Sequence, residues 1–285
     1  MTKSFVHLHA HTEYSMLDGA AKIVDYLKKV KELNQPAAAI TDHGNLYGAM
    51  EFVQKANDLG IKPIIGYEAY ITPGSRFDRP DRENNKRYHL TLLAENNIGY
   101  QNLVELVSKA YTEGYYYKPR IDYELLDQHH DGLIALSGCL GGELAQHLAP
   151  DGSVEEGNTS NERSFEKALD IAKKYQSIFG KENYFIEIHN HGIKQQLDIL
   201  DDLVEIAELI DAPLVAANDS HYVEENGAEA HDALLCVQTN RTLDDESRFR
   251  FDGSGYYVKS SEEMRKLFPE DKYPGACDNT LAIAD

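Results

Sequence analysis

The chain has 285 residues, of which 42% are hydrophobic, so it can bury a substantial core as one large domain or two small ones. Its formal net charge of −20, from 28 basic and 48 acidic residues, is opposite to the balance usual in a free-standing nucleic-acid-binding protein. The absence of a long apolar run and of a secretion signal, together with only three widely spaced cysteines, predicts a cytoplasmic protein with no membrane partner and no disulfide framework.

The first predicted element is an extended segment, Phe5–His9, that continues into His11. Because alternate residues of an extended strand share a face, His7, His9 and His11 are expected to point the same way. A single histidine at a strand end is more often a hydrogen-bonded structural residue. Three at alternate positions, in a chain with 12 histidines, favour a metal site instead.

Further short apolar runs predict strands at Ala37–Thr41, Lys62–Ile71, Leu90–Ala94, Leu133–Ser137, Tyr184–His189 and Leu214–Ala217. Apolar residues at helical spacing lie between them, as in Ile23–Val30, Leu103–Ala110 and Leu200–Ala207. Strands that alternate with helices imply parallel pairing and an α/β architecture. Seven such units favour a closed barrel over an open sheet.

Two segments without periodicity, Thr72–Arg87 and Pro150–Asn161, are predicted to be surface loops. Near the end of the chain we expect a helix over Glu262–Phe268, started by Ser261, and then an apolar segment, Thr280–Ala284, with no stop signal. We therefore predict a single domain over residues 1–285, with the barrel over roughly 1–270 and with 271–285 beginning a connection to something longer.

In parallel α/β folds, functional groups gather in the loops that follow the carboxyl ends of the strands. Most potential metal ligands obey that rule, namely His9, His11, Asp18, His43, Glu68, Cys139, Asp219 and His221. His89 is the exception, because it precedes its strand, and its position alone leaves a structural role open.

The mixture of imidazole, carboxylate and thiolate ligands suits Zn²⁺, with Mn²⁺ or Fe²⁺ as alternatives. Asp219 and His221 repeat the i, i+2 spacing of His9 and His11. With His89 the candidates exceed the four ligands that one tetrahedral ion needs, so we expect two or three divalent ions that share bridging carboxylates. Clusters of this kind typically hydrolyse phosphate esters.

At this level of detail the chain resembles the PHP (polymerase and histidinol phosphatase) family, and within it the PHP domains of bacterial DNA polymerase III alpha subunits. The resemblance extends from residue 5 to the C-terminus, and it is carried by the motifs Val6–Ser15, Leu17–Gly19, Ile40–Leu46, Gly66–Tyr70, His89–Ala94, Lys118–Asp122, Ala135–Leu140 and Asn218–Tyr222. It implies a distorted seven-stranded (βα) barrel with the metal site at the C-terminal ends of the strands. All nine candidates, His89 included, would then be ligands of up to three ions. His7 would be structural, and His189 and His191 candidates for lining the pocket.

The activity that the resemblance implies is 3′→5′ exonuclease proofreading of DNA, in which a hydroxide held by the ions attacks the terminal phosphodiester. The implied partners are the 3′ end of a DNA primer, the remainder of the polymerase alpha subunit, a separate exonuclease subunit and the sliding clamp. Arg120, with Lys118, is a candidate phosphate clamp, since guanidinium groups match phosphate geometry. An ion pair of Arg120 with Asp122 or Glu124 is the alternative.

Two other functions use the same residues. One is a small-molecule phosphatase, and the other is a non-catalytic module, braced by metals, that supports a polymerase and docks an exonuclease subunit.

The loop Thr72–Arg87 holds five basic residues between Glu68 and His89, and we expect it either to guide DNA or to be a solvated loop with internal ion pairs.

Overall fold

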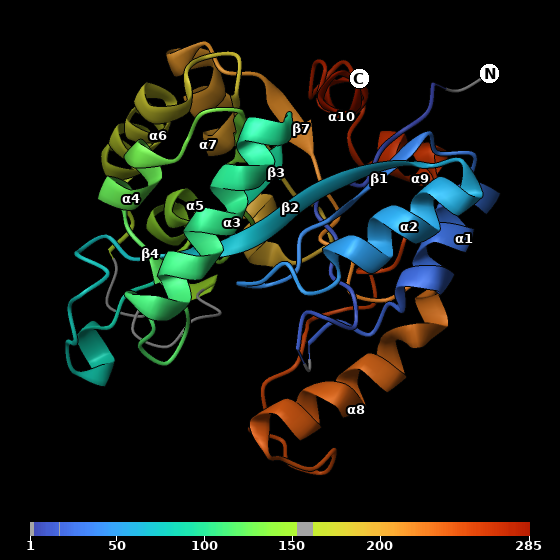
Figure 1. Cartoon of the computed structure of the whole chain (residues 1–285), viewed down its shortest axis with the longest axis horizontal. Coiled ribbons are helices and arrows are strands. Elements are labelled where there is room, and N and C mark those ends of the chain that lie inside the picture. Colours follow the sequence, from blue (N-terminus) through green and yellow to red (C-terminus); the bar gives the residue numbers. More distant parts are fainter. Residues whose placement is uncertain (1–2, 17, 153–161) are drawn as a thin grey trace.

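The computed structural model describes residues 3–16, 18–152 and 162–285, so Leu17 of the Leu17–Gly19 motif and most of the predicted loop Pro150–Asn161 lie outside it. A curled sheet runs through the centre of the molecule (Figure 1). Its strands are β1 (Ala37–Ile40), β2 (Lys62–Ile71), β3 (Tyr88–Ala94), β4 (Arg120–Ile121), β5 (Leu133–Leu136), β6 (Tyr184–Ile188) and β7 (Leu214–Ala216). Their order is β1-β2-β3-β5-β6-β7, with β4 paired to β2. The predicted distorted α/β barrel is confirmed.

The predicted first strand, Phe5–His9, is wrong as a strand, and the short β4 was not predicted. The N-terminal segment nevertheless lies between β1 and the chain that follows β7. The amide of Ala39 donates to His7 O (3.0 Å), and the amide of His11 donates to Ser220 O (2.8 Å). The amide of Ala10 donates instead to the side-chain oxygen of Thr41 (2.8 Å), which interrupts a regular ladder.

Parallel pairing throughout is also wrong, because β3 is antiparallel to both β2 and β5. The segment Thr72–Arg87 contains only a 3₁₀ turn, Arg82–Asn84, and no crossover helix. Without such a helix the chain can only turn back and pair antiparallel. Consequently the start of β3 lies beside the end of β2, and His89 pairs with Tyr70.

Most of the helices surround the sheet, and α8 projects away from it (Figure 1). They are α1 (Ile23–Glu32), α2 (Ala49–Leu59), α3 (Asn97–Thr112), α4 (Tyr123–Gln128), α5 (Glu143–Leu148), α6 (Phe165–Phe179), α7 (Lys194–Ile210), α8 (Ala228–Thr239), α9 (Ser261–Leu267) and α10 (Asp278–Ala284). The three predicted helical patterns are confirmed in α1, α3 and α7. The helix predicted near residue 262 is α9, but its N-cap is Ser260, which forms a capping box with Glu263, and not Ser261.

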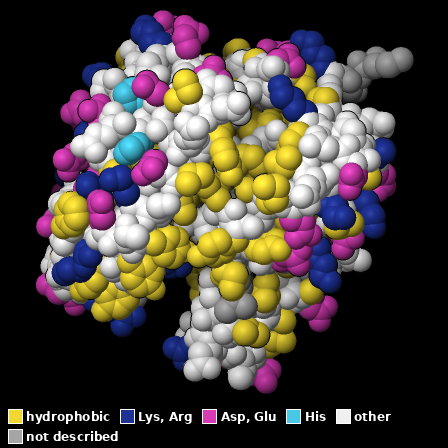
Figure 2. All heavy atoms as spheres, in the orientation of Figure 1, with side chains coloured by type: hydrophobic (Ala, Val, Ile, Leu, Met, Phe, Trp, Pro, Cys, Tyr) yellow, Lys and Arg dark blue, Asp and Glu magenta, His cyan; other side chains and the backbone are white. Residues whose placement is uncertain are grey.

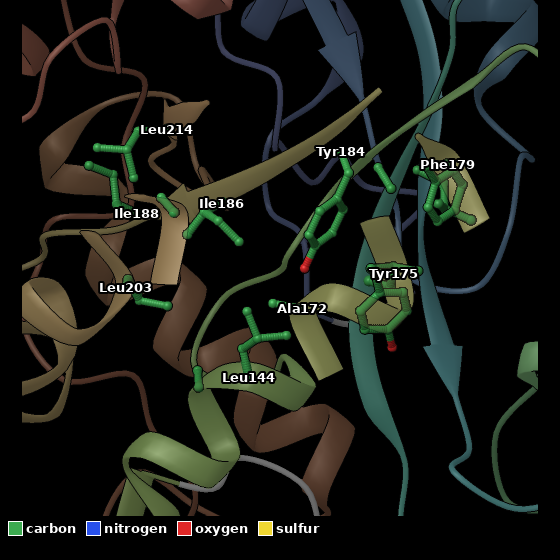
Figure 3. Close-up of a cluster of buried hydrophobic side chains, with 14 of the residues drawn as sticks. Leu144, Ala172, Tyr175, Phe179, Tyr184, Ile186, Ile188, Leu203 and Leu214 are labelled. Carbon is green, nitrogen blue, oxygen red and sulfur yellow. The ribbon is translucent and has the colours of Figure 1, made fainter. Parts of the chain in front are cut away.

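The largest core cluster lies between α5, α6, α7 and the sheet, where Leu144, Tyr175, Tyr184 and Ile186 pack together (Figure 3). Each fully buried large apolar side chain contributes about 1.5–3 kcal/mol to folding. This packing gives the ends of β5 and β6 a rigid support.

The C-terminal helix α10 packs beside β7 and next to the N-terminal segment, where the amide of Val6 donates to Thr280 Oγ1 (3.1 Å). Both termini therefore lie at one end of the molecule (Figure 1). The division between a barrel and a connection near residue 270 stays a prediction. Among the described residues, no helix combines the length and the apolar character needed to cross a bilayer.

Candidate metal centre

The nine sequence-predicted ligands converge at one edge of the barrel. His9 and His11 come from the N-terminal segment, and His43 follows β1. The others lie on or beside strands that meet at the same edge, namely Asp18, Glu68 within β2, His89 at the start of β3, Cys139 after β5, and Asp219 and His221 after β7. Because β3 is antiparallel, its start and the carboxyl ends of the other strands share this edge, which explains why His89 departs from the strand-end rule.

Glu68 is the centre of the cluster. Its Oε2 lies 2.7 Å from His43 Nδ1 and 3.3 Å from His11 Nε2. Its Oε1 lies 3.1 Å from His89 Nδ1 and 3.4 Å from His9 Nε2. Each carboxylate oxygen thus faces two imidazole nitrogens, which is the disposition of a carboxylate that bridges two ions.

Two aspartates extend the cluster to either side. Asp219 Oδ1 lies 3.1 Å from His11 Nε2 and 3.4 Å from His9 Nε2. Asp18 Oδ2 lies 3.2 Å from His43 Nε2, and its Oδ1 lies 3.7 Å from the fifth histidine, His221. Asp219 has a left-handed backbone (φ 45°), a strained conformation that is common at functional sites.

Three of the imidazoles are held in orientation by a polar contact at Nδ1, the nitrogen that faces away from the centre of the cluster. His9 Nδ1 donates to Glu187 Oε1 (2.7 Å), and His221 Nδ1 donates to the carbonyl of Asp219 (2.8 Å). His11 Nδ1 lies 2.9 Å from the hydroxyl of Ser15. Partners of this kind fix the tautomer and leave Nε2 with a lone pair for a metal.

Within the part of the chain that the structure describes, seven buried atoms of the cluster lie close to one another but form no hydrogen bond of good geometry, namely His9 Nε2, His11 Nε2, Asp18 Oδ1, His43 Nδ1, Glu68 Oε2, Asp219 Oδ1 and His221 Nε2. An unsatisfied buried polar atom costs about 1–3 kcal/mol. So many around one point fit divalent cations, which would satisfy them all at once. The donor set therefore fits the predicted group of two or three ions.

The metal-free cluster is an array of opposite charges. The carboxylates of Glu68 and Asp18 raise the pKa of His43 to about 9 although burial lowers it, so a cation must displace a proton from this imidazole in order to bind. Although burial raises the pKa of Glu68, the imidazoles of His43, His89 and His9 hold it well below its usual range. Burial is the main cause that lowers the pKa of His221 to about 3, so this imidazole is neutral.

Cys139 completes the cluster, with Sγ 3.6 Å from Glu68 Oε1 and 3.7 Å from His89 Nδ1. Burial, followed by the charges of Glu68 and Asp219, raises its pKa well above the usual value. A cation must displace this proton in order to bind the sulfur, which links metal affinity to pH.

Sequence reasoning placed Glu187 at a strand end but left it out of the ligand set. The residue is fully buried, and besides His9 it accepts from His189 Nε2 (2.9 Å) and from the amide of Gly138 (3.0 Å). One carboxylate therefore positions the His9 ring and the turn that carries Cys139. The alternation of Glu187 and His189 on one strand face was the signal available in the sequence.

The remaining histidines of the predicted motifs lie apart from the cavity. His7 Nε2 donates to the carbonyl of Lys259 (2.9 Å), and burial lowers the pKa of His7 to about 4, as suits a structural residue. His191 donates to the carbonyl of Asn218 (2.8 Å) and stacks on Tyr256.

Arg120 does not point into the site, and its geometry does not support a phosphate clamp. It is fully buried, and its guanidinium donates to Gly114 O (3.1 Å), Asn85 Oδ1 (3.0 Å) and Asp78 O (2.7 Å). The alternative, an ion pair of Arg120 with Asp122 or Glu124, is not formed either, since both carboxylates lie against Arg76.

A cavity of about 780 Å³ opens above the cluster. In Figure 2 the surface is indented between α8 and the rest of the molecule, and residues from both parts line the cavity. Its lining includes five basic side chains, which are Arg87, Lys118, Arg241, Arg248 and Arg250. Apart from Asp18 and Asp219, the acidic residues that line it in the described chain are Asp151 and Asp252. The wall is therefore locally basic on a protein of charge −20.

Comparisons with known proteins identify the family. The PHP domain family model matches residues 7–191. DNA polymerase III subunit alpha of Thermus aquaticus is 49% identical over 289 residues, covering 98% of this chain and 22% of that protein. The Mycobacterium tuberculosis protein of the same name is 47% identical over 296 residues, covering 99% and 24%.

The chain thus spans about a quarter of the length of the curated relatives that it matches. Among solved structures, a two-domain protein from Bacteroides vulgatus that contains a predicted PHP-like metal-dependent phosphoesterase has a TM-score of 0.42 at 10% identity. That similarity covers 92% of this chain and 62% of the other.

Proposed function

Because the chain belongs to the PHP family, as a PHP domain of the DNA polymerase III alpha type, we propose that it is a metal-dependent 3′→5′ exonuclease that hydrolyses the terminal phosphodiester of DNA. The observation that supports the proposal is the convergence of nine candidate ligands, seven of whose buried atoms form no hydrogen bond of good geometry, at the floor of a basic cavity. A cluster that only braced the fold would need no such cavity above it.

Several side chains would share the work. Three of the groups suited to hold an ion consist of predicted ligands: His11, Asp18, His43 and His221; His9, His11 and Asp219; and His43, Glu68 and His89. A fourth group combines His9 with Glu187 and His189. Divalent ions, with zinc favoured and manganese or iron as alternatives, would supply positive charge that offsets the charge developing on the phosphodiester oxygens. Lys118, whose Nζ lies 3.2 Å from the hydroxyl of Tyr70 at the cavity wall, would bind a non-bridging phosphate oxygen.

The setting of this reaction is also part of the proposal. The domain would act in the cytoplasm as one part of a polymerase alpha subunit, on the 3′ end of a primer that has frayed from its template. The separate exonuclease subunit and the sliding clamp are proposed partners of the complete polymerase.

The decisive test removes ligands from opposite ends of the chain. His9→Ala or His221→Ala should abolish release of mononucleotides from DNA, lower the bound metal measured by mass spectrometry, and lower the Tm, since a ligand bound only by the native state stabilises it. The control is His130→Ala, which removes a partly exposed histidine outside the cluster and should change none of the three. Unchanged metal content and cleavage in both cluster variants would contradict the proposal.

The same preparations separate the competing functions. Release of inorganic phosphate from monoesters without cleavage of DNA would indicate a small-molecule phosphatase. If the protein holds its full metal content but hydrolyses neither DNA nor a chromogenic diester, it is the non-catalytic module.

The soft ligand offers a second test. Thiolate favours zinc over the harder manganese ion, so Cys139→Ser should weaken zinc binding more than manganese binding. Titration of the metal-free protein with each ion measures both affinities, and Cys236→Ser, at a buried cysteine outside the cluster, is the control. An equal loss for the two metals would remove Cys139 from the ligand set.

A further inference from the structure

Part of the cavity wall comes from residues 241–252, called here the rim segment, of which Arg241 and the residues 247–252 line the cavity. This segment contains the run Arg248-Phe249-Arg250-Phe251, and all four residues line the cavity. Phe249 is 40% exposed, so a large apolar ring faces solvent at the mouth of a polar site. An exposed aromatic ring in such a place is available to bind a ligand.

An aromatic series connects this ring to the metal centre. Phe251 packs edge-on against the ring of His221, with centroids 4.8 Å apart. Phe249 in turn packs edge-on against Phe251, with centroids 5.8 Å apart. A molecule whose phosphate lies at the metal centre would therefore have the Phe249 ring one aromatic layer away from it.

The rim segment is held in place by an ion pair to α8 and by hydrogen bonds within the segment. Arg248 is nearly buried (6% exposed side chain) and forms a two-point contact with Asp232 of α8. Asp245 accepts from the amide and hydroxyl of Ser247 (2.9 and 2.7 Å). The ring of Phe249 is thus presented by an ordered backbone, which reduces the entropy lost on binding.

The other arginines of the segment remain close to solvent. Arg241 is 55% exposed, and its only ion pair in the described chain is a surface pair with Asp245, of the kind that contributes little stability. Arg250 is exposed and donates to the carbonyl of Glu246 (3.0 Å). Both guanidinium groups can therefore reach a phosphate without breaking a buried contact.

We propose that the rim segment is a subsite for the 3′-terminal part of single-stranded DNA, in which a base stacks on Phe249 while Arg241 and Arg250 contact the adjoining backbone phosphates. The inference rests on the proposed nuclease function and specifies how its substrate is held. Every base has a π-face, so stacking accepts any sequence, as a proofreading site requires. A small phosphomonoester would leave Phe249 uncovered.

The test uses the full chain with a short single strand that carries 2-aminopurine at its 3′ terminus and a phosphorothioate at the last linkage to slow cleavage. Stacking on Phe249 should quench the fluorescence of the probe. Phe249→Ala should remove the quench and raise the Kd about tenfold, as expected when one base no longer stacks on an aromatic ring. Phe249→Trp should restore both. Leu243→Ala is the matched control, because Leu243 is an exposed apolar residue (53%) of the same segment that does not line the cavity.

The outcomes are separable from those of the nuclease assay. A probe with 2-aminopurine at its 5′ end should show no quench that depends on Phe249. An equal Kd and equal quench for Phe249→Ala and Leu243→Ala would overturn the subsite, whatever the nuclease activity. A quench that depends on Phe249, in a protein that cleaves no DNA, would support the subsite and contradict only the proposed reaction.

Discussion

Two arginine-rich segments flank the metal centre, the loop Thr72–Arg87 and the rim segment, and they use their guanidinium groups differently. In the loop, Arg76 is nearly buried (8% exposed side chain), with Nη1 2.9 Å from Asp122 and Nε 2.7 Å from Glu113. Arg79 donates to backbone carbonyls, among them that of Glu113 (3.0 Å). In the rim segment only Arg248 is used in this way among the described arginines. Arg241 and Arg250 remain exposed.

The difference shows that the number of charges in a segment does not determine its function. A guanidinium group can be buried only where acceptors satisfy its five donors. For Arg76 and Arg79 those acceptors include Asp122 and both the side chain and the carbonyl of Glu113, which are remote in sequence. Arg76 and Arg79 therefore pack as part of the fold, and of the basic residues of the loop Arg87 lines the cavity. The rim segment, which lines it with three arginines, is the better candidate for contact with DNA.

The largest expected contrast is in stability. Arg76→Ala leaves Asp122 buried without its cation, and breaking a buried ion pair in this way should cost about 3–5 kcal/mol of unfolding free energy. Arg250→Ala removes an exposed side chain and should change it by less than about 0.5 kcal/mol. Urea unfolding of both variants measures the difference. Similar values for the two would show that Arg76 is not structural, and the comparison would fail.

The grouping of the candidate ligands was the part of the site that followed from the sequence, and their binding of metal stays a prediction. Their positions at i, i+2 and after strands constrain them locally, so the pattern of residues is enough to place His9, His11, Asp219 and His221. His89 could be assigned only by family resemblance, because its place depends on the antiparallel β3. The absence of a helical pattern in Thr72–Arg87 was the signal for that reversal.

Side-chain direction was what the sequence could not supply. Arg120 stands in a motif beside Lys118, yet its guanidinium is turned into the loop while Lys118 lines the cavity. Glu187 acts through a hydrogen bond to a ligand 178 residues away. The directions of both side chains depend on contacts between segments that are distant in sequence, and a local sequence pattern does not predict such contacts.

The next contrast is in the salt dependence of DNA binding. Neutralising Arg241 and Arg250 together should lower the slope of log Kd against log salt concentration by roughly 0.7 for each phosphate that the variant no longer neutralises. Neutralising Arg79 and Arg82 together should change the slope less, because Arg79 already donates to three backbone carbonyls. Fluorescence anisotropy of labelled single-stranded DNA measures both.

A double variant at matched charge supplies the control. Arg163, whose side chain is 60% exposed and pairs with Asp202, does not line the cavity, and Lys173 is a second exposed cation of this kind. Their joint neutralisation changes net charge equally and should leave the slope unchanged. A larger effect from the Arg79 and Arg82 variant than from the rim variant would reverse the comparison and return the DNA contact to the loop.

The smallest effect concerns the pH dependence of the unfolding free energy that the Arg76–Glu113 contact contributes. The hydrogen bond from Arg76 lowers the pKa of Glu113 below its usual value of about 4.3. A carboxyl whose pKa is lower in the folded state stabilises the fold above its unfolded pKa, and this contribution is lost as the pH falls through the folded pKa. Glu113→Gln cannot titrate, so the difference in unfolding free energy between wild type and variant should be complete near neutral pH and shrink in acid. Denaturant unfolding at several pH values measures it. The contact is partly exposed, so a small difference is expected. A difference that stayed constant into acid would show that the contact with Arg76 does not lower the pKa of Glu113.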